Sequence, residues 1–114
     1  MAPLVCHLYD LGLIEAQAVP QSGVFAAALS FARAEGLMPA PEPSHALKVA
    51  MDEALRCKAS GERKVIVFNL CGHGHFDMAA YEQYLGGRLH DHEHPEHAIE
   101  AALKDLPGLQ PDPK

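Results

Sequence analysis

The sequence has few aromatic residues, with no Trp, three Tyr and four Phe among its 114 residues. Any core must therefore be built mainly from Ala, Leu, Val and Ile, whose individual burial energies are modest. We expect a single small domain, residues 1–114, because domains commonly contain roughly 100–200 residues. The apolar fraction of 48% and the charged fraction of 21% exclude a disordered chain. The composition thus predicts a folded domain of marginal stability.

Basic residues are also scarce, with nine Lys and Arg against 15 Asp and Glu. Because no stretch combines basic and aromatic side chains, we expect no nucleic-acid partner. No apolar run approaches the roughly 18–20 residues that span a bilayer, and the first residues lack the basic flank of a signal peptide. We therefore expect no membrane partner and a cytoplasmic location. The cysteines Cys6, Cys57 and Cys71 form no CxxC pair, which argues against a disulfide framework or a structural zinc site.

Apolar spacing, Pro and Gly together predict a series of short elements. In chain order these are a short strand or extended entry segment at Leu13–Val19, a helix over about 22–35 capped by Ser22 and ended by Gly36, an extended Pro-rich loop at Leu37–Pro43, a helix that Ser44 caps and that ends at Ser60-Gly61, a helix from Met78 to about Leu85, and a helix over about 95–106.

The segment Val65–Leu70 is apolar and rich in β-branched residues. Such a run is typical of a strand buried on both faces in a parallel sheet. The predicted fold class is therefore α/β, a helix-rich fragment in which a parallel-type buried strand is flanked by helices. Ligands of open α/β sheets bind beyond the carboxyl ends of strands, so residues 71–77 are the first candidate site.

This candidate site has the sequence Cys-Gly-His-Gly-His-Phe-Asp. Gly72 and Gly74 would let the backbone approach a small-molecule ligand closely. One interpretation is a hydrolase of esters, lactones or amides, with Cys71 as nucleophile, His73 or His75 as base and Asp77 as orienting group. In a variant of it, the histidines hold a metal-bound water. The alternative is a structural Gly turn with surface histidines.

Two further segments carry candidate ligands. His90, His92, His94 and His97 could collect zinc or nickel, or they could be incidental residues of a solvated loop. In the Pro-rich loop, the prolines fix where the Glu42 carboxylate points, which suits a ligand-facing wall and equally suits a simple helix entry.

Two ordered stretches about 30 residues apart carry a resemblance to a known family. They are Ala34-Glu35-Gly36-Leu37-Met38-Pro39-Ala40-Pro41-Glu42-Pro43-Ser44-His45-Ala46 and Lys64-Val65-Ile66-Val67-Phe68-Asn69-Leu70-Cys71-Gly72-His73-Gly74-His75-Phe76-Asp77. Both closely resemble the C-terminal part of tryptophan synthase beta chains. The GHGHFD version and Pro41 look like the second, stand-alone type.

The resemblance implies a fold-type II pyridoxal-phosphate enzyme that joins L-serine to indole by β-replacement. It implies that Cys71, usually Ser in the family, faces the pyridine nitrogen of the cofactor and that Glu42 lies near the ring. A thiol would leave that nitrogen neutral but orient it less firmly than a hydroxyl. Gly72 and Gly74 belong to the turn that would border the cofactor's phosphate end in an assembled site.

The family's Schiff-base lysine and phosphate cup lie in its N-terminal part, and no segment here resembles either. None of the lysines, Lys48, Lys58, Lys64, Lys104 and Lys114, stands in a matching context. The resemblance therefore implies a truncated chain that starts at an internal methionine of the family and is unable to make tryptophan alone. Cofactor binding, a recruited hydrolase site and a non-catalytic self-associating module stay open as alternatives. The expected partner is a second copy or the missing N-terminal portion.

Overall fold

The structure is a computed structural model that describes residues 2–91 and 96–104. Its elements are α1 (Pro3–Asp10), α2 (Gln21–Glu35), α3 (Pro41–Ser60), the 3-10 turn η1 (Gly74–Phe76), α4 (Met78–Leu85) and α5 (Glu96–Lys104). The described part of the chain contains no β-strand. The expectation of a helix-rich fragment is therefore confirmed, whereas its strand component is not observed.

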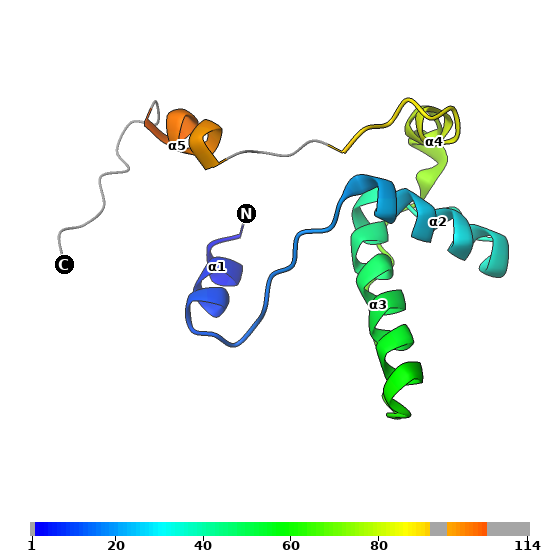
Figure 1. Cartoon of the computed structure of the whole chain (residues 1–114), viewed down its shortest axis with the longest axis horizontal. Helices are drawn as coiled ribbons and strands as arrows, with labels where there is room; N and C mark the ends of the chain where they lie inside the picture. Colours follow the sequence, from blue (N-terminus) through cyan, green and yellow to red (C-terminus); the bar gives the residue numbers. More distant parts are fainter. Residues whose placement is uncertain (1, 92–95, 105–114) are drawn as a thin grey trace.

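The core lies where α2 crosses α3 and where α4 covers the beginning of α2 (Figure 1). Ala27 and Ala28 of α2 and Leu47 of α3 are buried, and Ala28 packs in one cluster with Phe25 and Tyr81. Phe25 and Tyr81 join α2 to α4 through an edge-to-face contact with ring centroids 5.0 Å apart. As the composition predicts, most of the buried apolar residues are small or aliphatic.

Helix α2 begins one residue before its predicted start and ends as predicted at Gly36, whose φ of +72° gives the left-handed cap. Ser22 is not the cap. Its backbone N–H and its hydroxyl both donate to the carboxylate of Asp91, which lies far along the chain. The first turn of α2 therefore receives its acceptor from a distant residue, and the negative charge also suits the positive end of the helix dipole.

Replacing Asp91 with Ala is expected to lower the free energy of unfolding by about 1 kcal/mol, the usual cost of a lost N-terminal cap. Urea denaturation followed by circular dichroism measures this change. Asp10 is the matched control, because it is an exposed acidic residue that ends α1. An equal loss in the two variants would show that Asp91 does not act as a cap.

Helix α3 begins at Pro41, earlier than predicted, and ends at Gly61 as predicted. The expected extended loop therefore covers residues 37–40 alone. Proline is tolerated in the first turn because the N–H groups there have no partner within the helix. The hydroxyl of Ser44 donates back to the carbonyl of Ala40 instead of capping a later start.

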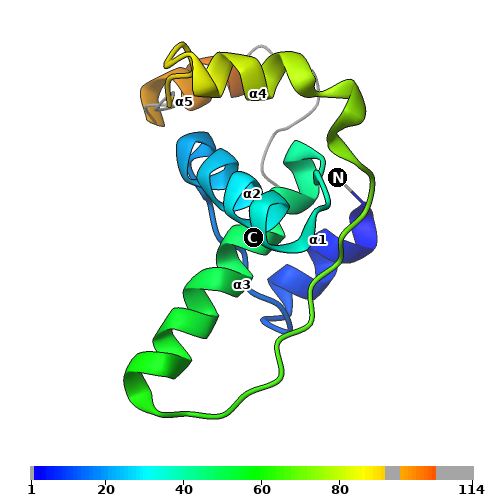
Figure 2. The ribbon, with the colours of Figure 1, turned by 90° about the vertical axis from the view of Figure 1, so that its right-hand side faces the viewer.

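The segment 62–73 is extended but has no strand partner among the described residues (Figure 2). Val65 and Val67 are 93% and 87% exposed, whereas Ile66 and Phe68 are half-buried. Phe68 meets Phe31 of α2 edge to face at 6.3 Å. The predicted strand is therefore not observed among the described residues, because a strand exists only when a neighbour pairs with it. The exposure of Val65 and Val67 also shows that the segment is not buried on both faces here. Of the two forms predicted for Leu13–Val19, the strand is likewise not observed, and residues 15–19 form a segment without helix or strand that leads into α2.

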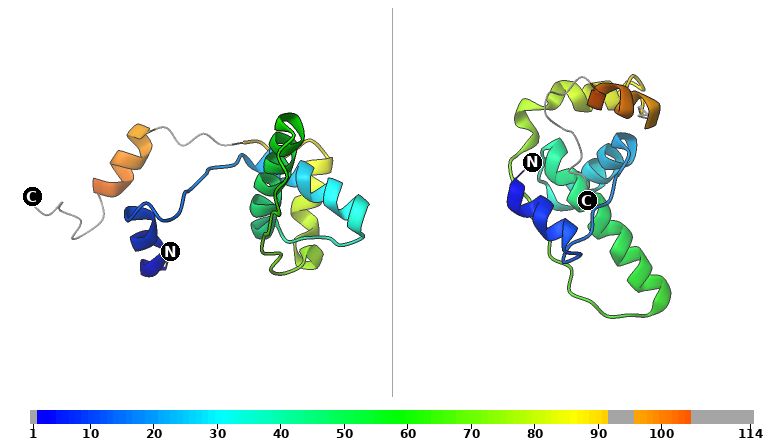
Figure 3. Two further views of the ribbon diagram at one scale, coloured as in Figure 1. Left: turned by 90° about the horizontal axis from the view of Figure 1, so that it is seen from below. Right: turned by 90° about the vertical axis from the view of Figure 1, so that its left-hand side faces the viewer.

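The remaining helices agree in part with the sequence. Helix α4 has its predicted bounds, and α5 falls within the predicted 95–106, of which Pro95 and residues 105–106 lie outside the described residues. Helix α1 was not predicted from the sequence. Helices α1 and α5 lie apart from the α2–α4 core in the left view of Figure 3. No described helix is long and apolar enough to cross a membrane.

Candidate functional site

The two sequence motifs meet in space. The backbone N–H of Gly74 donates to the carbonyl of Met38 at 2.9 Å, and the hydroxyl of Tyr81 donates to the carbonyl of Pro39 at 2.7 Å. We call this contact, in which residues 38–42 meet residues 71–77 and Tyr81, the motif junction. It joins the start of α3 to the turn before α4, although the bonded residues Pro39 and Tyr81 are 42 positions apart.

Three consecutive carbonyl groups organise the motif junction. Gly74 binds the carbonyl of Met38, Tyr81 that of Pro39, and the Ser44 hydroxyl that of Ala40 at 2.7 Å. Pro39 and Ala40 are buried, so their carbonyl groups could not be solvated by water. Each donor comes from a different element, and the three bonds together fix the turn, α4 and α3 against one short stretch of backbone.

The junction leaves no room for a side chain at Gly74. An added Cβ would lie 2.5 Å from the carbonyl oxygen of Pro39 and 3.1 Å from the Tyr81 ring. Gly72 is required for another reason, since its φ of +77° is one that other residues rarely adopt. The N–H of Gly74 already donates to the carbonyl of Met38. The predicted cofactor role of this glycine would therefore rest on close packing and not on a hydrogen bond from its N–H to the cofactor.

The two histidines of the turn lie together, but Cys71 does not join them. The His73 and His75 rings are 4.8 Å apart, and the His75 N–H donates to Nδ1 of His73 at 3.3 Å. Cys71 is an exposed free thiol with no hydrogen bond to either histidine among the described residues. Asp77 is half-buried at the start of α4, without a side-chain cap bond. The arrangement lacks the nucleophile and base contact that a Cys-based hydrolase uses.

Metal-ligating groups do not converge in the part of the chain that the structure describes. No set of three or more His, Cys, Asp or Glu side chains there could hold a metal ion. Of the predicted histidine segment, His92 and His94 lie outside the described residues. The carbonyl of the neighbouring His90 accepts a hydrogen bond from the Gln21 side chain, so this end of the segment holds the start of α2.

Tyr81 is the residue of the junction that sequence reasoning missed. Its side chain is 1% exposed, and burial raises the pKa of the phenol, opposed by a hydrogen bond with Ser44 and assisted by the Asp77 carboxylate. The hydroxyl therefore stays protonated, as a donor, throughout the neutral pH range. A buried Tyr needs a partner for its hydroxyl, and this rule alone could have singled it out.

Glu42 and Cys71, the predicted ring-facing residues, both remain accessible beside the junction. Glu42 lies exposed in the first turn of α3, and Cys71 is exposed at the end of the extended segment. A thiol and a carboxyl group can both form hydrogen bonds to the ring of a pyridoxal cofactor. Lys48 and Lys64 are engaged in ion pairs with Asp52 and Glu53, away from this position. Glu42 and Cys71 thus have the chemistry to contact the ring end of such a cofactor.

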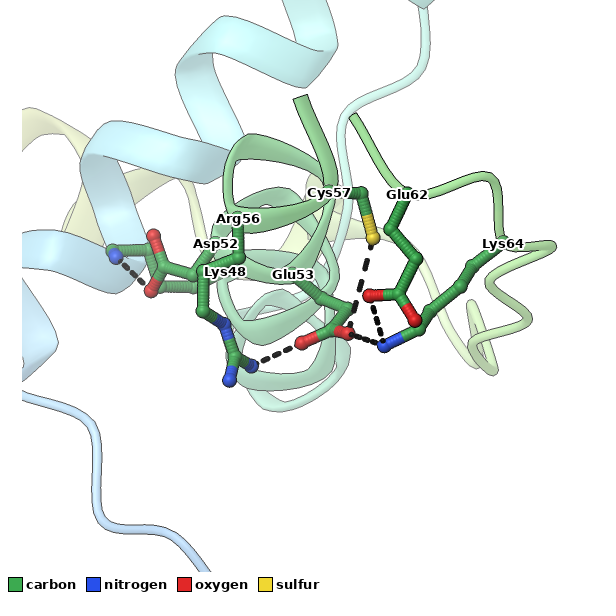
Figure 4. Close-up of polar contacts among 7 residues, drawn as sticks. All are labelled: Lys48, Asp52, Glu53, Arg56, Cys57, Glu62 and Lys64. Carbon is green, nitrogen blue, oxygen red and sulfur yellow. Dashed lines mark hydrogen bonds and ion pairs between the residues drawn. The ribbon is translucent and has the colours of Figure 1, made fainter. Parts of the chain in front are cut away.

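An ion-pair cluster holds the other end of the extended segment to α3 (Figure 4). The ammonium of Lys64 lies 3.1 Å from Glu53 and 3.0 Å from Glu62, and Arg56 also pairs with Glu53. The Lys64 ammonium donates to both carboxylates. Its hydrogen bond to Glu53 lowers the pKa of Glu53, and its hydrogen bonds to Glu62 and Glu53 raise the pKa of Lys64. The cluster anchors residues 62–64 before the exposed valines begin.

Replacing Lys64 with Met is expected to lower the urea midpoint at neutral pH more than the same replacement of Lys58, an exposed lysine in the last turn of α3. The ion pair is intact between the ordinary pKa values of 4.5 for Glu53 and 10.5 for Lys64. It is lost as the pH falls through the lowered Glu53 pKa and as it rises through the raised Lys64 pKa. A Lys64 effect that persists in strong acid would contradict this origin.

Comparison with known proteins places the two motifs in one family. No protein-family profile matches the chain. It is 62% identical over 90 residues, 79% of its length, to the tryptophan synthase beta chain 2 of Aquifex aeolicus, of which these residues are 21%. It is 56% identical over 77% of its length to that of Methanosarcina mazei and 48% identical over 85% to that of Thermococcus kodakarensis, covering 20% and 22% of those proteins.

The resemblance inferred from the two motifs is therefore confirmed: the chain is similar to tryptophan synthase beta chains. Specifically, it corresponds to the C-terminal part of the second type, beta chain 2, and spans about a fifth of the length of the curated relatives that it matches.

Proposed function

We propose that this chain supplies the ring-facing part of a pyridoxal-phosphate site and does not synthesise tryptophan by itself. The observation that carries the proposal is the motif junction, in which the Gly74–Met38 and Tyr81–Pro39 hydrogen bonds hold the turn that follows Cys71 against the stretch that precedes Glu42. These are the residues that the resemblance to the beta chain assigns to the cofactor ring. Both are exposed, as partners of a group held mainly by other residues would be.

When bound, the cofactor supplies an electron sink for carbanion chemistry at the amino acid. The residues of this chain bind and orient it. The Cys71 thiol would face the ring nitrogen as a weak hydrogen-bonding group and would leave it uncharged, as the resemblance implies. Gly72 allows the turn to come close, and Glu42 presents a carboxylate beside the ring. The lysine that forms the Schiff base and the donors that hold the phosphate come from the remaining four fifths of a beta chain.

We further propose that residues 65–70 form a strand once that remainder is present. Their exposure alternates as in a strand covered on one face, with Ile66 and Phe68 inward and Val67 outward. An open groove of about 480 Å³ lies between this segment, residues 15–19 and α3, and its lining combines apolar residues such as Val49 with the polar side chains of Glu15 and Glu53. A neighbouring strand would satisfy the unpaired backbone groups, which completes the α/β architecture expected from the sequence.

Cofactor retention tests the proposal. The chain is incubated with pyridoxal phosphate, alone or with the N-terminal four fifths of the Aquifex aeolicus relative, and then dialysed. We expect retained visible absorption in the mixture alone, and a further loss in Cys71→Ala compared with the exposed control Cys6→Ala. Retention by this chain alone, or equal retention by the two cysteine variants, would contradict the assigned roles.

A second role, self-association, is favoured by one observation. The outward valines of the extended segment are almost fully exposed, and an unpaired hydrophobic strand edge is a template for pairing with another chain. We propose that the chain forms a dimer when the remainder of the beta chain is not supplied. Sedimentation of wild type and Val67→Lys tests this: a dimer that the charge disperses is expected, and a wild-type monomer would overturn it.

A further inference from the structure

We infer that Tyr81 is a positioning residue, which sets the spacing between the two motifs and so places Cys71 relative to Glu42. The inference rests on the proposed function and assigns Tyr81 no contact with the cofactor. Its ring is fixed in the core against Phe25, with centroids 5.0 Å apart at an interplanar angle of 83°. Its hydroxyl extends from that anchor to the carbonyl of Pro39 at 2.7 Å. Tyr81 is therefore tied to the helix core and to the first motif at once.

The second motif is tied to the same backbone stretch. Gly74 donates to Met38, the residue before Pro39, and an added Cβ at Gly74 would touch the Tyr81 ring. The turn is thus held between the Pro39 carbonyl and the phenol ring. Removing the hydroxyl leaves a buried carbonyl without its partner, which favours a displacement of residues 38–40 toward water. The Gly74–Met38 bond and the position of Cys71 depend on that stretch.

Tyr84 distinguishes this role from ordinary core packing. It lies on the same helix, and its ring stacks on the same Phe25 with centroids 5.6 Å apart. No hydrogen bond in the described structure links its hydroxyl to either motif. Tyr81→Phe and Tyr84→Phe therefore remove the same atom from neighbouring rings, but only the first removes a bond to the motif junction.

Two readouts test the inference. In the chain alone, amide hydrogen exchange of Gly74 is expected to become about tenfold faster in Tyr81→Phe and to stay unchanged in Tyr84→Phe. In the mixture with the N-terminal part of the Aquifex aeolicus relative, the dissociation constant of pyridoxal phosphate is expected to rise about tenfold in Tyr81→Phe alone. This constant is measured on folded protein, so a general loss of stability does not change it.

The outcomes separate the two proposals. Faster exchange at Gly74 with a weaker cofactor supports the positioning role. Unchanged exchange, or faster exchange with unchanged cofactor affinity, overturns it. If the wild-type mixture binds no cofactor, the proposed function fails, and the exchange result then decides by itself whether Tyr81 couples the two motifs.

Discussion

Replacing Phe25 with Ala is expected to lower the free energy of unfolding by about 3–5 kcal/mol, the largest effect of any single substitution considered. Phe25 is 5% exposed and contacts both aromatic rings of α4, Tyr81 edge to face and Tyr84 by stacking. Its removal leaves a cavity between α2 and α4 that small Ala-rich helices cannot fill. Since small domains have total stabilities of about 5–15 kcal/mol, this loss is a large share of the total, and only at the lower end of that range would much of the variant be unfolded at room temperature.

Phe76 provides the matched control for this substitution. It is the same residue type, but it is 91% exposed at the end of η1. Phe76→Ala should change the free energy of unfolding by less than about 0.5 kcal/mol. Urea denaturation with a circular dichroism signal measures both variants. Similar losses for the two substitutions would show that the α2–α4 contact does not hold the core together.

Replacing Gly74 with Ala is expected to cost about 1–3 kcal/mol and to open the motif junction. The added Cβ would lie 2.5 Å from the Pro39 carbonyl oxygen and 2.9 Å from the Met38 side chain. A backbone atom cannot move aside as a side-chain end can, so the turn itself must withdraw from residues 38–39. The Gly74–Met38 hydrogen bond is then lost, and the Tyr81–Pro39 bond is strained.

The control for this substitution is Gly23→Ala in the first turn of α2. There an added Cβ would meet only the end of the Lys48 side chain, at 3.4 Å. Because Ala favours helix over Gly, this variant should keep its stability or gain up to about 1 kcal/mol. Thermal unfolding compares the two. A Gly74→Ala variant as stable as Gly23→Ala would mean that the turn does not pack on the Pro-rich stretch as described.

The sequence predicted the elements whose ends are set by local chemistry. Gly36 and Gly61 end α2 and α3 where expected, because a left-handed cap depends on one residue and its immediate neighbours. The start of α3 differed because a proline in the first turn costs little, whereas the same residue later in a helix would break it. The cap of α2 came from Asp91, which no local pattern in residues 20–25 could indicate.

The strand at residues 65–70 shows the limit of such reasoning. Its composition is that of a buried strand, but a strand forms only when two segments pair through their backbones. No described residue pairs with this segment. The motif junction was likewise beyond local patterns. The resemblance singled out the residues on each side of it, whereas Tyr81 and the carbonyl groups of residues 38–40 became visible only in three dimensions.

Formation of tryptophan from L-serine and indole, with pyridoxal phosphate supplied, tests the central claim most directly. The rate is measured for this chain, for the N-terminal four fifths of the Aquifex aeolicus relative, and for the two together. We predict product in the mixture alone, because the motif junction provides one side of the site and the relative provides the other. Product from this chain alone, or an inactive mixture in which the two parts bind each other and the cofactor, would contradict the account.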